Sequence, residues 1–202
     1  GLYGINNINR FLQSNNESFP IQWGINIYKV NDPILFNESE RFAPLIYNNL
    51  KGKIFAIKPF EDKIQFDIEI DKVINEFDAE KYDFRLLGTS DNGKSIISFF
   101  VNKYRSTDED DDYSSNAVVP FQIAYAVSIH KAQGLEYNSV KIVITDEVEE
   151  LITHNVFYTA ITRAKEKLRI YWSPETEHKV LSNLKQKNNR KDAALLSSKF
   201  NL

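Results

Sequence analysis

The middle of the chain alternates apolar and polar side chains with the two-residue period of a β-strand. Residues 64–70 alternate throughout, which predicts a strand with one buried face and one wet face. Residues 53–57 and 95–101 give two further strands, and the Asp91-Asn92-Gly93 sequence before the latter predicts a hairpin turn. Short strands at this spacing favour a small β-barrel.

The first thirty-odd residues predict a helix followed by one strand. Apolar side chains recur at helical spacing within residues 1–13, and residues 25–30 alternate as a strand does. Residues 31–33, Asn-Asp-Pro, are typical of a turn. This segment therefore precedes the β-rich region as a structure of its own.

The last third of the chain alternates predicted strands with predicted helices. The run at 140–144 is apolar and β-branched apart from one lysine, as in a strand buried on both faces of a parallel sheet. Ser173 and Pro174 supply a cap and a first turn for a final helix. The other predicted elements are strands at 122–128 and 167–172, a short helix starting at 129–133, and a helix at 154–164. This order predicts an α/β layer with a parallel sheet.

Composition narrows the class of protein but does not identify a function. The chain has 202 residues, of which 42% are hydrophobic and 26% charged, as in a soluble globular protein. Cysteine is absent, which excludes disulfides, thiolate catalysis and cysteine-zinc sites, and only three histidines occur, which disfavours a histidine-rich metal site. No apolar run reaches membrane-spanning length. We expect a cytoplasmic protein with no membrane partner and no bound metal of its own.

The net charge of −3 conceals an uneven distribution. Residues 108–112 are all acidic, and without them the formal net charge would be +2. A mildly basic body is compatible with a local phosphate-binding track, and equally with none. The acidic run lacks the spacing of a calcium loop, so we interpret it as a solvated, mobile loop. Most of the 14 Phe and 10 Tyr residues, Phe66, Phe99 and Phe100 among them, are expected to pack rather than to stack on bases.

Residues 124–136 carry the most informative set of polar side chains. Ser128 and His130 can donate hydrogen bonds to a phosphate oxygen, and Glu136 can accept them from sugar hydroxyls. Gly134 lets the backbone approach a bound anion because it has no Cβ. Each residue alone has a plainer interpretation, such as a structural histidine or a glycine helix cap. The ordered set, placed after a predicted strand, favours a ligand site.

Residues 155–170 add a helix that carries a second polar set. Tyr158 and Thr162 share one helical face, and Thr159 and Arg163 share the neighbouring one. The planar fork of Arg163 suits phosphate oxygens and could stabilise charge on a γ-phosphate. Taken alone, this residue would be interpreted as a surface arginine of an amphipathic helix.

Together the two segments closely resemble motifs V and VI of superfamily 1 helicases, in the carboxyl-terminal lobe of RecD-like and UvrD-like proteins. The resemblance implies DNA-backbone contacts for Ser128, His130 and Lys131. It implies that Gly134 and Glu136 face the nucleotide and that Gln133 couples the nucleotide and DNA sites. It also implies that Arg163 is an arginine finger. The implied ATP-binding residues are therefore Gln133, Gly134, Glu136 and Arg163.

The rest of the chain is similar to the same family. Residues 1–13 resemble the glycine and Asn-Arg…Gln run that follows motif IV, and residues 29–32 and 46–54 resemble two further elements. The last of these departs from the family's pattern at Asn48-Asn49-Leu50, after an insertion. The resemblance implies a RecA-like α/β lobe with a mostly parallel sheet and an inserted SH3-like barrel. The expected divisions are 1–50 and 118–202 for the lobe, 51–104 for the barrel and 105–117 for an acidic loop.

The printed sequence contains no glycine-rich phosphate loop of the usual kind. Gly93-Lys94-Ser95 lacks the upstream glycine and is interpreted as a turn. The resemblance therefore implies that ATP binds with Mg²⁺ held by an upstream amino-terminal lobe, and that this chain alone is inactive. Its start at Gly1, without an initiator Met, suggests a piece of a larger protein.

The expected function is that of the second motor lobe of an ATP-dependent DNA helicase, with single-stranded or duplex DNA and the upstream lobe as partners. Two alternatives stay open: a non-catalytic nucleic-acid-binding module derived from a helicase, and an RNA helicase lobe. The pathway, whether DNA repair, recombination or plasmid transfer, and the oligomeric state are open as well.

Overall fold

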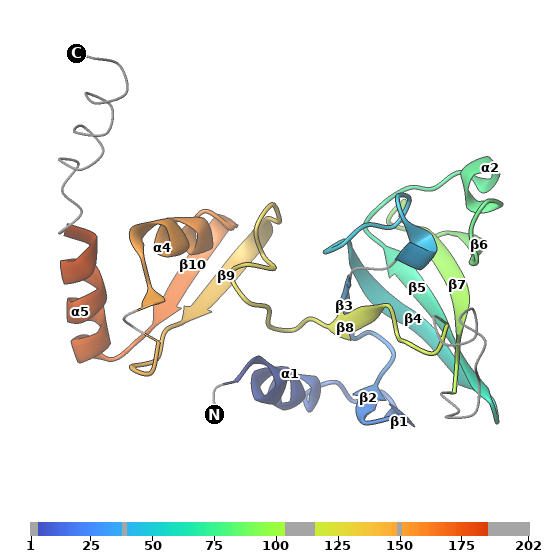
Figure 1. Cartoon of the computed structure of the whole chain (residues 1–202), viewed down its shortest axis with the longest axis horizontal. Helices are drawn as coiled ribbons and strands as arrows, with labels where there is room; N and C mark the ends of the chain where they lie inside the picture. The colour runs from blue at the N-terminus through green and yellow to red at the C-terminus, as the bar shows by residue number, and fades with distance from the viewer. Residues whose placement is uncertain (1–3, 38–39, 104–115, 149–150, 186–202) are drawn as a thin grey trace, which may run out of the picture. The chain divides into compact units, whose positions relative to one another are not determined.

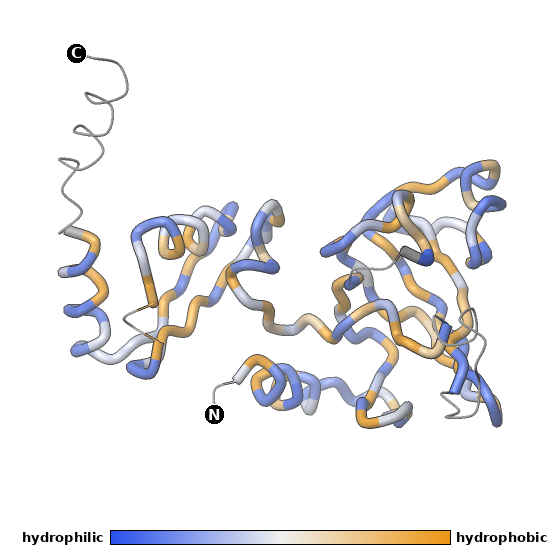
Figure 2. The backbone as a smooth tube through the Cα atoms, viewed as in Figure 1, coloured by the Kyte–Doolittle hydropathy of each residue, from blue (hydrophilic) through white to orange (hydrophobic). Residues whose placement is uncertain are grey.

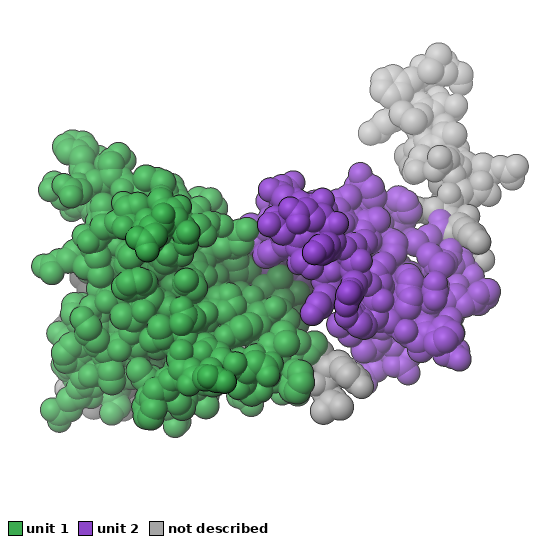
Figure 3. Space-filling model, turned by 180° about the vertical axis from the view of Figure 1, so that it is seen from behind, with its two compact units in different colours: residues 1–127 green, residues 128–202 purple. Residues whose placement is uncertain are grey.

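The computed structural model describes residues 4–37, 40–103, 116–148 and 151–185 (Figure 1). The chain divides into two compact units, residues 1–127 and residues 128–202, coloured separately in Figure 3. The division falls within the first of the two motif segments and leaves its residues 128–136 in unit 2. Most of the predicted acidic loop lies outside the described residues.

Unit 1 begins with the predicted helix. α1 spans Ile5–Gln13 and starts after Gly4, whose backbone is extended. A small antiparallel hairpin follows, formed by β1 (Ile21–Trp23) and β2 (Asn26–Tyr28). Gly24 turns this hairpin with a φ of +59°, a value that L side chains rarely adopt. The predicted strand at 25–30 is therefore present, but shorter.

The main sheet of unit 1 has six strands in the order β6-β7-β5-β4-β3-β8, and every neighbouring pair is antiparallel. Short helical segments, η1 (Glu40–Phe42) and α2 (Glu76–Ala79), lie in its connections. The six strands are β3 (Pro33–Phe36), β4 (Lys51–Pro59), β5 (Lys63–Ile70), β6 (Arg85–Thr89), β7 (Ser95–Asn102) and β8 (Phe121–Ile123).

Two predictions about the sheet are wrong. In the part of the chain that the structure describes, β6 and β8 are edge strands that do not pair, so the sheet stays open and forms no closed SH3-like barrel. The sheet is also mainly antiparallel, not mostly parallel, because β8 pairs with β3 in this sheet instead of leading into a parallel one. The turn predicted before residue 95 is present, with Gly93 at φ +74°.

The core of unit 1 lies on one face of β5 and β7. Alternate side chains of β5, such as Phe66, are fully buried, as its two-residue pattern predicts, but Asp67 and Glu69 on the face predicted to be wet are buried as well. The Phe66 ring lies 5.2 Å from that of Tyr28 and 5.0 Å from that of Phe121, both in edge-on geometry. These contacts join strands that are distant in sequence, and Figure 2 shows apolar residues along the sheet strands. The third predicted interior residue, Phe100, lies on the opposite face and is 40% exposed.

Unit 2 contains a β-α-β arrangement and a further helix. β9 (Tyr137–Val143) pairs in parallel with β10 (Ala164–Tyr171), and α4 (His154–Ile161) lies between them in sequence. α5 (Pro174–Lys185) follows. The hydroxyl of Ser173 accepts a hydrogen bond from the Thr176 amide at 3.1 Å, as the predicted cap requires. The strands and helices predicted after residue 137 are present with shifted ends.

No helix among the described residues is both long enough and apolar enough to cross a membrane.

Candidate nucleotide and nucleic-acid site

Within the first motif segment, residues 128–136 form a compact turn in place of the predicted short helix. The Ala132 amide donates to the Ser128 carbonyl at 3.0 Å, and the Leu135 amide donates to the Ala132 carbonyl at 3.0 Å. Ala132 is 8% exposed, and Ile129 packs against the hydrophobic cluster of unit 2. The predicted site residues are carried outward, since the side chains of His130, Gln133 and Glu136 are exposed.

Ser128 and Lys131 lie at the half-buried start of this turn. The Lys131 amide donates to the Ser128 hydroxyl at 3.4 Å, so the hydroxyl caps the turn in the way a serine caps a helix. A hydroxyl oxygen that accepts one hydrogen bond still has its own proton to donate. The Ser128 side chain can therefore hold the turn and donate to a phosphate oxygen at the same time.

Gly134 ends the turn with a φ of +82°. A Cβ built at this position meets nothing within 4 Å, so the backbone conformation, and not crowding, requires glycine here. The same open space leaves the backbone of residue 134 accessible to a bound anion. Any L side chain at this position would strain the turn.

Arg163 follows α4 and its C-cap Thr162, and its guanidinium is held by three hydrogen bonds. Nε donates to the Thr159 carbonyl at 2.9 Å, and Nη2 donates to the Thr162 hydroxyl at 3.1 Å. Nη1 donates to the Leu135 carbonyl at 3.0 Å, which places the guanidinium against the backbone of residues 134–136. A guanidinium has five N–H groups, so two remain for a ligand.

The two motif segments are also joined through the backbone. The Tyr137 amide donates to the Arg163 carbonyl at 2.9 Å, where β9 and β10 begin their parallel pairing. Lys165 and Glu136 form an ion pair at 3.0 Å, with more than half of each side chain exposed. Burial raises the pKa of the neighbouring Tyr137 hydroxyl. The structure therefore brings together Leu135, Glu136, Arg163 and Lys165.

Sequence reasoning did not single out an exposed aromatic pair on α4. The rings of His154 and Tyr158 stack with an interplanar angle of 5° and centroids 6.4 Å apart. Tyr158 is 59% exposed. The two residues are four apart on one helix, so their proximity follows from the sequence once the helix is accepted. They add a flat π surface to the helix that leads to Arg163.

A second polar cluster, centred on the fully buried carboxylate of Asp32, lies in unit 1. The side chains of Gln13 and Asn16 donate to this carboxylate, as does the Lys29 amide at 2.8 Å. The Tyr125 hydroxyl donates to Oδ1 at 2.8 Å, and burial, followed by this bond, raises the pKa of Tyr125 to about 12. Both Gln13 and Asp32 lie in the segments that resemble the helicase family, but spacing alone does not predict that they meet.

α1 also holds the start of the first motif segment. The Asn9 amide group donates to the Ala126 carbonyl at 2.9 Å, and its oxygen accepts from the Ala126 amide at 2.8 Å. One side chain thus satisfies both polar groups of a residue two positions before Ser128. This cluster fixes the point at which the chain leaves unit 1.

Comparison with known proteins relates the motif segments to helicases. Residues 123–171 match the model of the UvrD-like helicase C-terminal domain. An uncharacterized protein of Methanocaldococcus jannaschii is 31% identical over 99 residues, which cover 48% of this chain and 8% of that protein. The RecBCD enzyme subunit RecD of Mycolicibacterium smegmatis is 33% identical over 58 residues, or 29% of this chain and 10% of that subunit. The chain therefore matches about a tenth of the length of these relatives or less.

The fold is similar to that of a solved helicase structure. Pif1 helicase from Bacteroides, in complex with ADP-AlF3 and single-stranded DNA, aligns with a TM-score of 0.52 and 13% identity over 97% of this chain and 43% of that chain. At this identity the likeness shows the fold alone, a mixed α/β fold with a mainly antiparallel sheet. Together with the sequence matches, it confirms the resemblance to the carboxyl-terminal lobe of superfamily 1 helicases.

Proposed function

We propose, on the basis of this confirmed resemblance, that the chain is the second motor lobe of an ATP-dependent DNA helicase. In this proposal Arg163 is the arginine finger that completes an ATP site shared with an upstream lobe. The observation that carries the proposal is the 3.0 Å hydrogen bond from the Arg163 guanidinium to the Leu135 carbonyl. It joins the two motif segments that have the residue types of a nucleotide site.

The hydrogen bonds of Arg163 suit the role of a finger. Three bonds to protein oxygens fix the plane of the guanidinium before any ligand arrives. A preorganised cation needs little rearrangement when negative charge develops on a transferred phosphoryl group, and such rearrangement would otherwise add to the barrier. Each η nitrogen retains one N–H group that can donate to phosphate oxygens. Lysine, with a single ammonium, could not keep both sets of contacts.

The neighbouring residues fit the nucleotide side of the proposed site. Gly134 offers accessible backbone, and the exposed Glu136 carboxylate can accept hydrogen bonds from ribose hydroxyls. The exposed Gln133 lies between these residues and the DNA-contacting set, where it can couple the two. ATP and Mg²⁺ require a phosphate-binding loop and metal ligands that the upstream lobe would supply. This chain would then contribute orientation and charge from one side.

The DNA side of the proposed site consists of Ser128, His130 and Lys131. The first can donate from its hydroxyl, and the other two add polar and cationic groups at the start of the turn. Contacts of this kind to phosphates carry no sequence information and depend strongly on salt. Closure of the two lobes around ATP would move these three residues relative to the DNA contacts of the upstream lobe. Each cycle of ATP hydrolysis would then move the protein along the DNA strand.

The test is the substitution Arg163→Ala in a protein that also carries the upstream lobe. ATP turnover stimulated by single-stranded DNA is expected to fall by about 10³-fold or more, because the finger stabilises charge in the transition state. Arg169→Ala is the matched control, because the exposed side chain of this arginine on β10 makes no hydrogen bond or ion pair with the described residues. Turnover near the wild-type level in Arg163→Ala would exclude the assigned finger.

The same assay separates the alternatives. A non-catalytic module predicts nucleic-acid binding with no ATP turnover, even with the upstream residues present. An RNA helicase lobe predicts turnover stimulated by single-stranded RNA and not by DNA. Lys131→Ala is expected to weaken DNA binding at low salt and to leave turnover intact at saturating DNA, since it would act on the strand and not on the phosphoryl group.

A further inference from the structure

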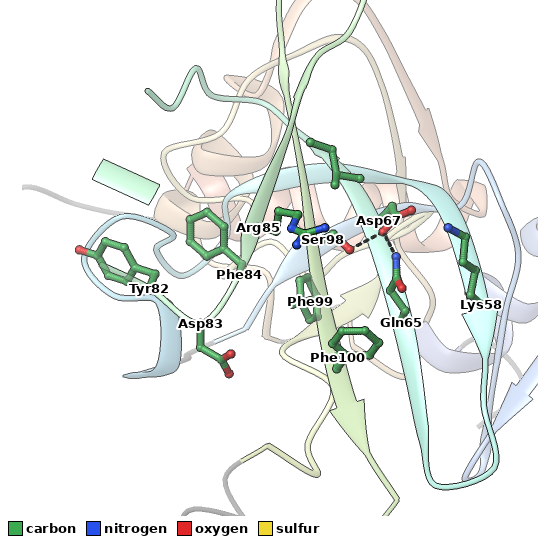
Figure 4. A pocket seen from close by; sticks show the side chains of 11 residues that line it. Lys58, Gln65, Asp67, Tyr82, Asp83, Phe84, Arg85, Ser98, Phe99 and Phe100 are labelled. Carbon is green, nitrogen blue, oxygen red and sulfur yellow. Dashed lines mark hydrogen bonds between the residues drawn. The ribbon is translucent and has the colours of Figure 1, made fainter. Parts of the chain in front are cut away.

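A groove crosses the main sheet, and its lining combines polar side chains with the core residues Phe84 and Phe99. It has a volume of about 620 Å³ and runs over β6, β7, β5 and β4 (Figure 4). Pairing register places its polar side chains in rows: Arg85 and Asp67 both oppose Ser98, while Phe100 and Lys58 both oppose Gln65. All of its lining residues belong to unit 1.

A buried carboxylate lies at the centre of this groove. Asp67 is 5% exposed and lines the groove. Its Oδ1 accepts two hydrogen bonds, from the Ser98 hydroxyl at 2.6 Å and from the Gln65 amide at 2.8 Å. No donor among the described residues reaches its Oδ2. A buried charged acceptor without a partner is costly, so a ligand with an N–H group would find a strong acceptor here.

Two cations flank the carboxylate. Lys58 on β4 and Arg85 on β6 are exposed, and neither side chain makes a hydrogen bond or ion pair within the described ranges. The strands that carry them are three strand spacings apart, roughly 14 Å at the usual interstrand distance. The groove's other acidic residue, Asp83, is already bound to Arg41. The groove therefore presents positive charge at both sides and one open acceptor between them.

An aromatic surface completes the set. Phe100 is 40% exposed, and its ring lies 4.6 Å from the Lys63 ammonium and 6.1 Å from the Phe60 ring. Exposed aromatic rings interleaved with cations are how proteins hold single strands, by stacking bases and neutralising phosphates. An acidic peptide would also meet the cations, but it would place carboxylates beside the buried Asp67 charge.

We propose that this groove binds single-stranded nucleic acid and selects the base that it holds. A base stacks on Phe100 and donates its exocyclic amino group to Oδ2 of Asp67, while Lys58 and Arg85 bind the adjacent phosphates. Cytosine, adenine and guanine carry such amino groups, whereas thymine presents a carbonyl at the corresponding position of cytosine. The groove thus prefers cytosine to thymine. This property goes beyond the proposed motor role, whose backbone contacts carry no sequence preference.

The experiment measures the affinity of the whole chain for fluorescein-labelled oligo(dC) and oligo(dT) of equal length, by fluorescence anisotropy at low salt. The wild-type protein is expected to bind oligo(dC) about tenfold more tightly, the scale of one hydrogen bond to a charged group. Asp67→Asn keeps the shape of the side chain and is expected to abolish the preference, because an amide can donate to the thymine carbonyl as well as accept from cytosine. Asp91→Asn, at an exposed turn of the same sheet, is the matched control.

The cations predict a second, independent result. The double substitution Lys58→Gln with Arg85→Gln is expected to lower the affinity for oligo(dC) and for oligo(dT) by the same factor. It should also reduce the slope of log affinity against log salt concentration by about 0.7 for each cation removed. Lys131→Ala tests the motor proposal separately, because it should lower both affinities without changing their ratio. Equal binding of oligo(dC) and oligo(dT), an unchanged ratio in Asp67→Asn, or no binding at all would overturn the groove proposal. If polyglutamate displaced the oligonucleotides from the Asp67→Asn variant as well as from the wild type, the groove would be a site for an acidic peptide, and the proposal would be overturned too.

Discussion

The two units of the chain differ in how much of their structure is buried. Among the described residues, eighteen buried hydrophobic side chains form one cluster in unit 1, and five form the cluster of unit 2. Unit 1 has a six-stranded antiparallel sheet, whereas unit 2 has a single parallel pair whose β10 is exposed at six of eight positions. Parallel strands are ordinarily covered on both faces. Unit 2 therefore has less of its own packing to stabilise it.

The larger core and the proposed ATP-site residues therefore lie in different units. Segments that rearrange during binding are drawn from the less stable parts of a fold, and residues 128–136 and 155–170 of the motif segments lie in unit 2. Unit 1, with the larger core, provides the groove around Asp67 and the buried cluster around Asp32. We expect the two units to unfold with different midpoints. The sequence provides one tryptophan for each, Trp23 and Trp172, so each unit has its own fluorescence reporter.

The largest effect is expected from Phe66→Ala. This fully buried ring contacts the rings of Tyr28, Phe99 and Phe121, so its removal should cost unit 1 about 3 to 5 kcal/mol. Urea unfolding followed through Trp23, in a Trp172→Phe background, measures the loss. The midpoint reported by Trp172, in a Trp23→Phe background, should stay in place.

The matched variant in unit 2 is Val180→Ala. Val180 is fully buried in α5 and belongs to the smaller cluster, so its truncation should cost about 1.5 kcal/mol and shift the Trp172 midpoint alone. If Phe66→Ala and Val180→Ala each moved both midpoints together, the two units would unfold as one, and the comparison between them would fail.

The contrast between the units also separates what sequence could predict from what it could not. Local patterns were sufficient for β5, whose alternation at 64–70 matches its buried face, and for α4, which begins at His154 as predicted. The sheet around β5 depends on pairings between distant segments, such as β3 with β8, and no local pattern specifies them. The strand predicted at 122–128 as part of a parallel layer is therefore replaced by the three-residue β8, Phe121–Ile123, in the antiparallel sheet of unit 1.

The polar clusters around Arg163 and Asp32 also differ in how far the sequence predicts them. The proximity of Arg163 to residues 134–136 was expected, because two motifs of one family imply one site, and the bond to Leu135 agrees with it. The burial of Asp32 was not expected. Asn31-Asp32-Pro33 has the composition of an exposed turn, and only the fold brings Gln13 and Tyr125 to the carboxylate. A buried charge is hard to predict from sequence because its donors lie anywhere along the chain.

An effect between those of Phe66→Ala and Val180→Ala is expected at this buried charge. Asp32→Asn replaces an acceptor oxygen by an amide group that faces donors from Asn16, Tyr125 or Lys29. The loss should be about 2 to 3 kcal/mol in unit 1, reported by Trp23, because charged hydrogen bonds in a buried site are replaced by donors facing donors. Asp91→Asn, on the surface of the same unit, should change stability by less than about 0.5 kcal/mol. A loss in Asp32→Asn no larger than in Asp91→Asn would show that the cluster does not stabilise unit 1.

The smallest effect compares one surface ion pair from each unit. In unit 1, Lys94 contacts Asp71 at 2.7 Å, with 40% and 36% of the side chains exposed, and its hydrogen bond and charge lower the pKa of the Asp71 carboxyl. A carboxyl whose pKa is lower in the folded state adds stability above its ordinary pKa of about 4 and loses it as the pH falls through the folded value. Lys94→Gln should therefore cost less than about 1 kcal/mol at pH 7, and this loss should vanish near pH 2.

The corresponding pair in unit 2, Lys165 with Glu136, has 55% and 58% of its side chains exposed. Solvent screens it more fully, so Lys165→Gln should cost less than Lys94→Gln at pH 7, measured by the same two tryptophans. Raising the salt concentration should reduce both losses, since exposed pairs are screened within about 10 Å at 0.1 M. Equal losses at every pH would mean that these charges act only through the net charge of the chain. A loss confined to neutral pH in unit 1 would instead assign it to the ionised Asp71 carboxylate.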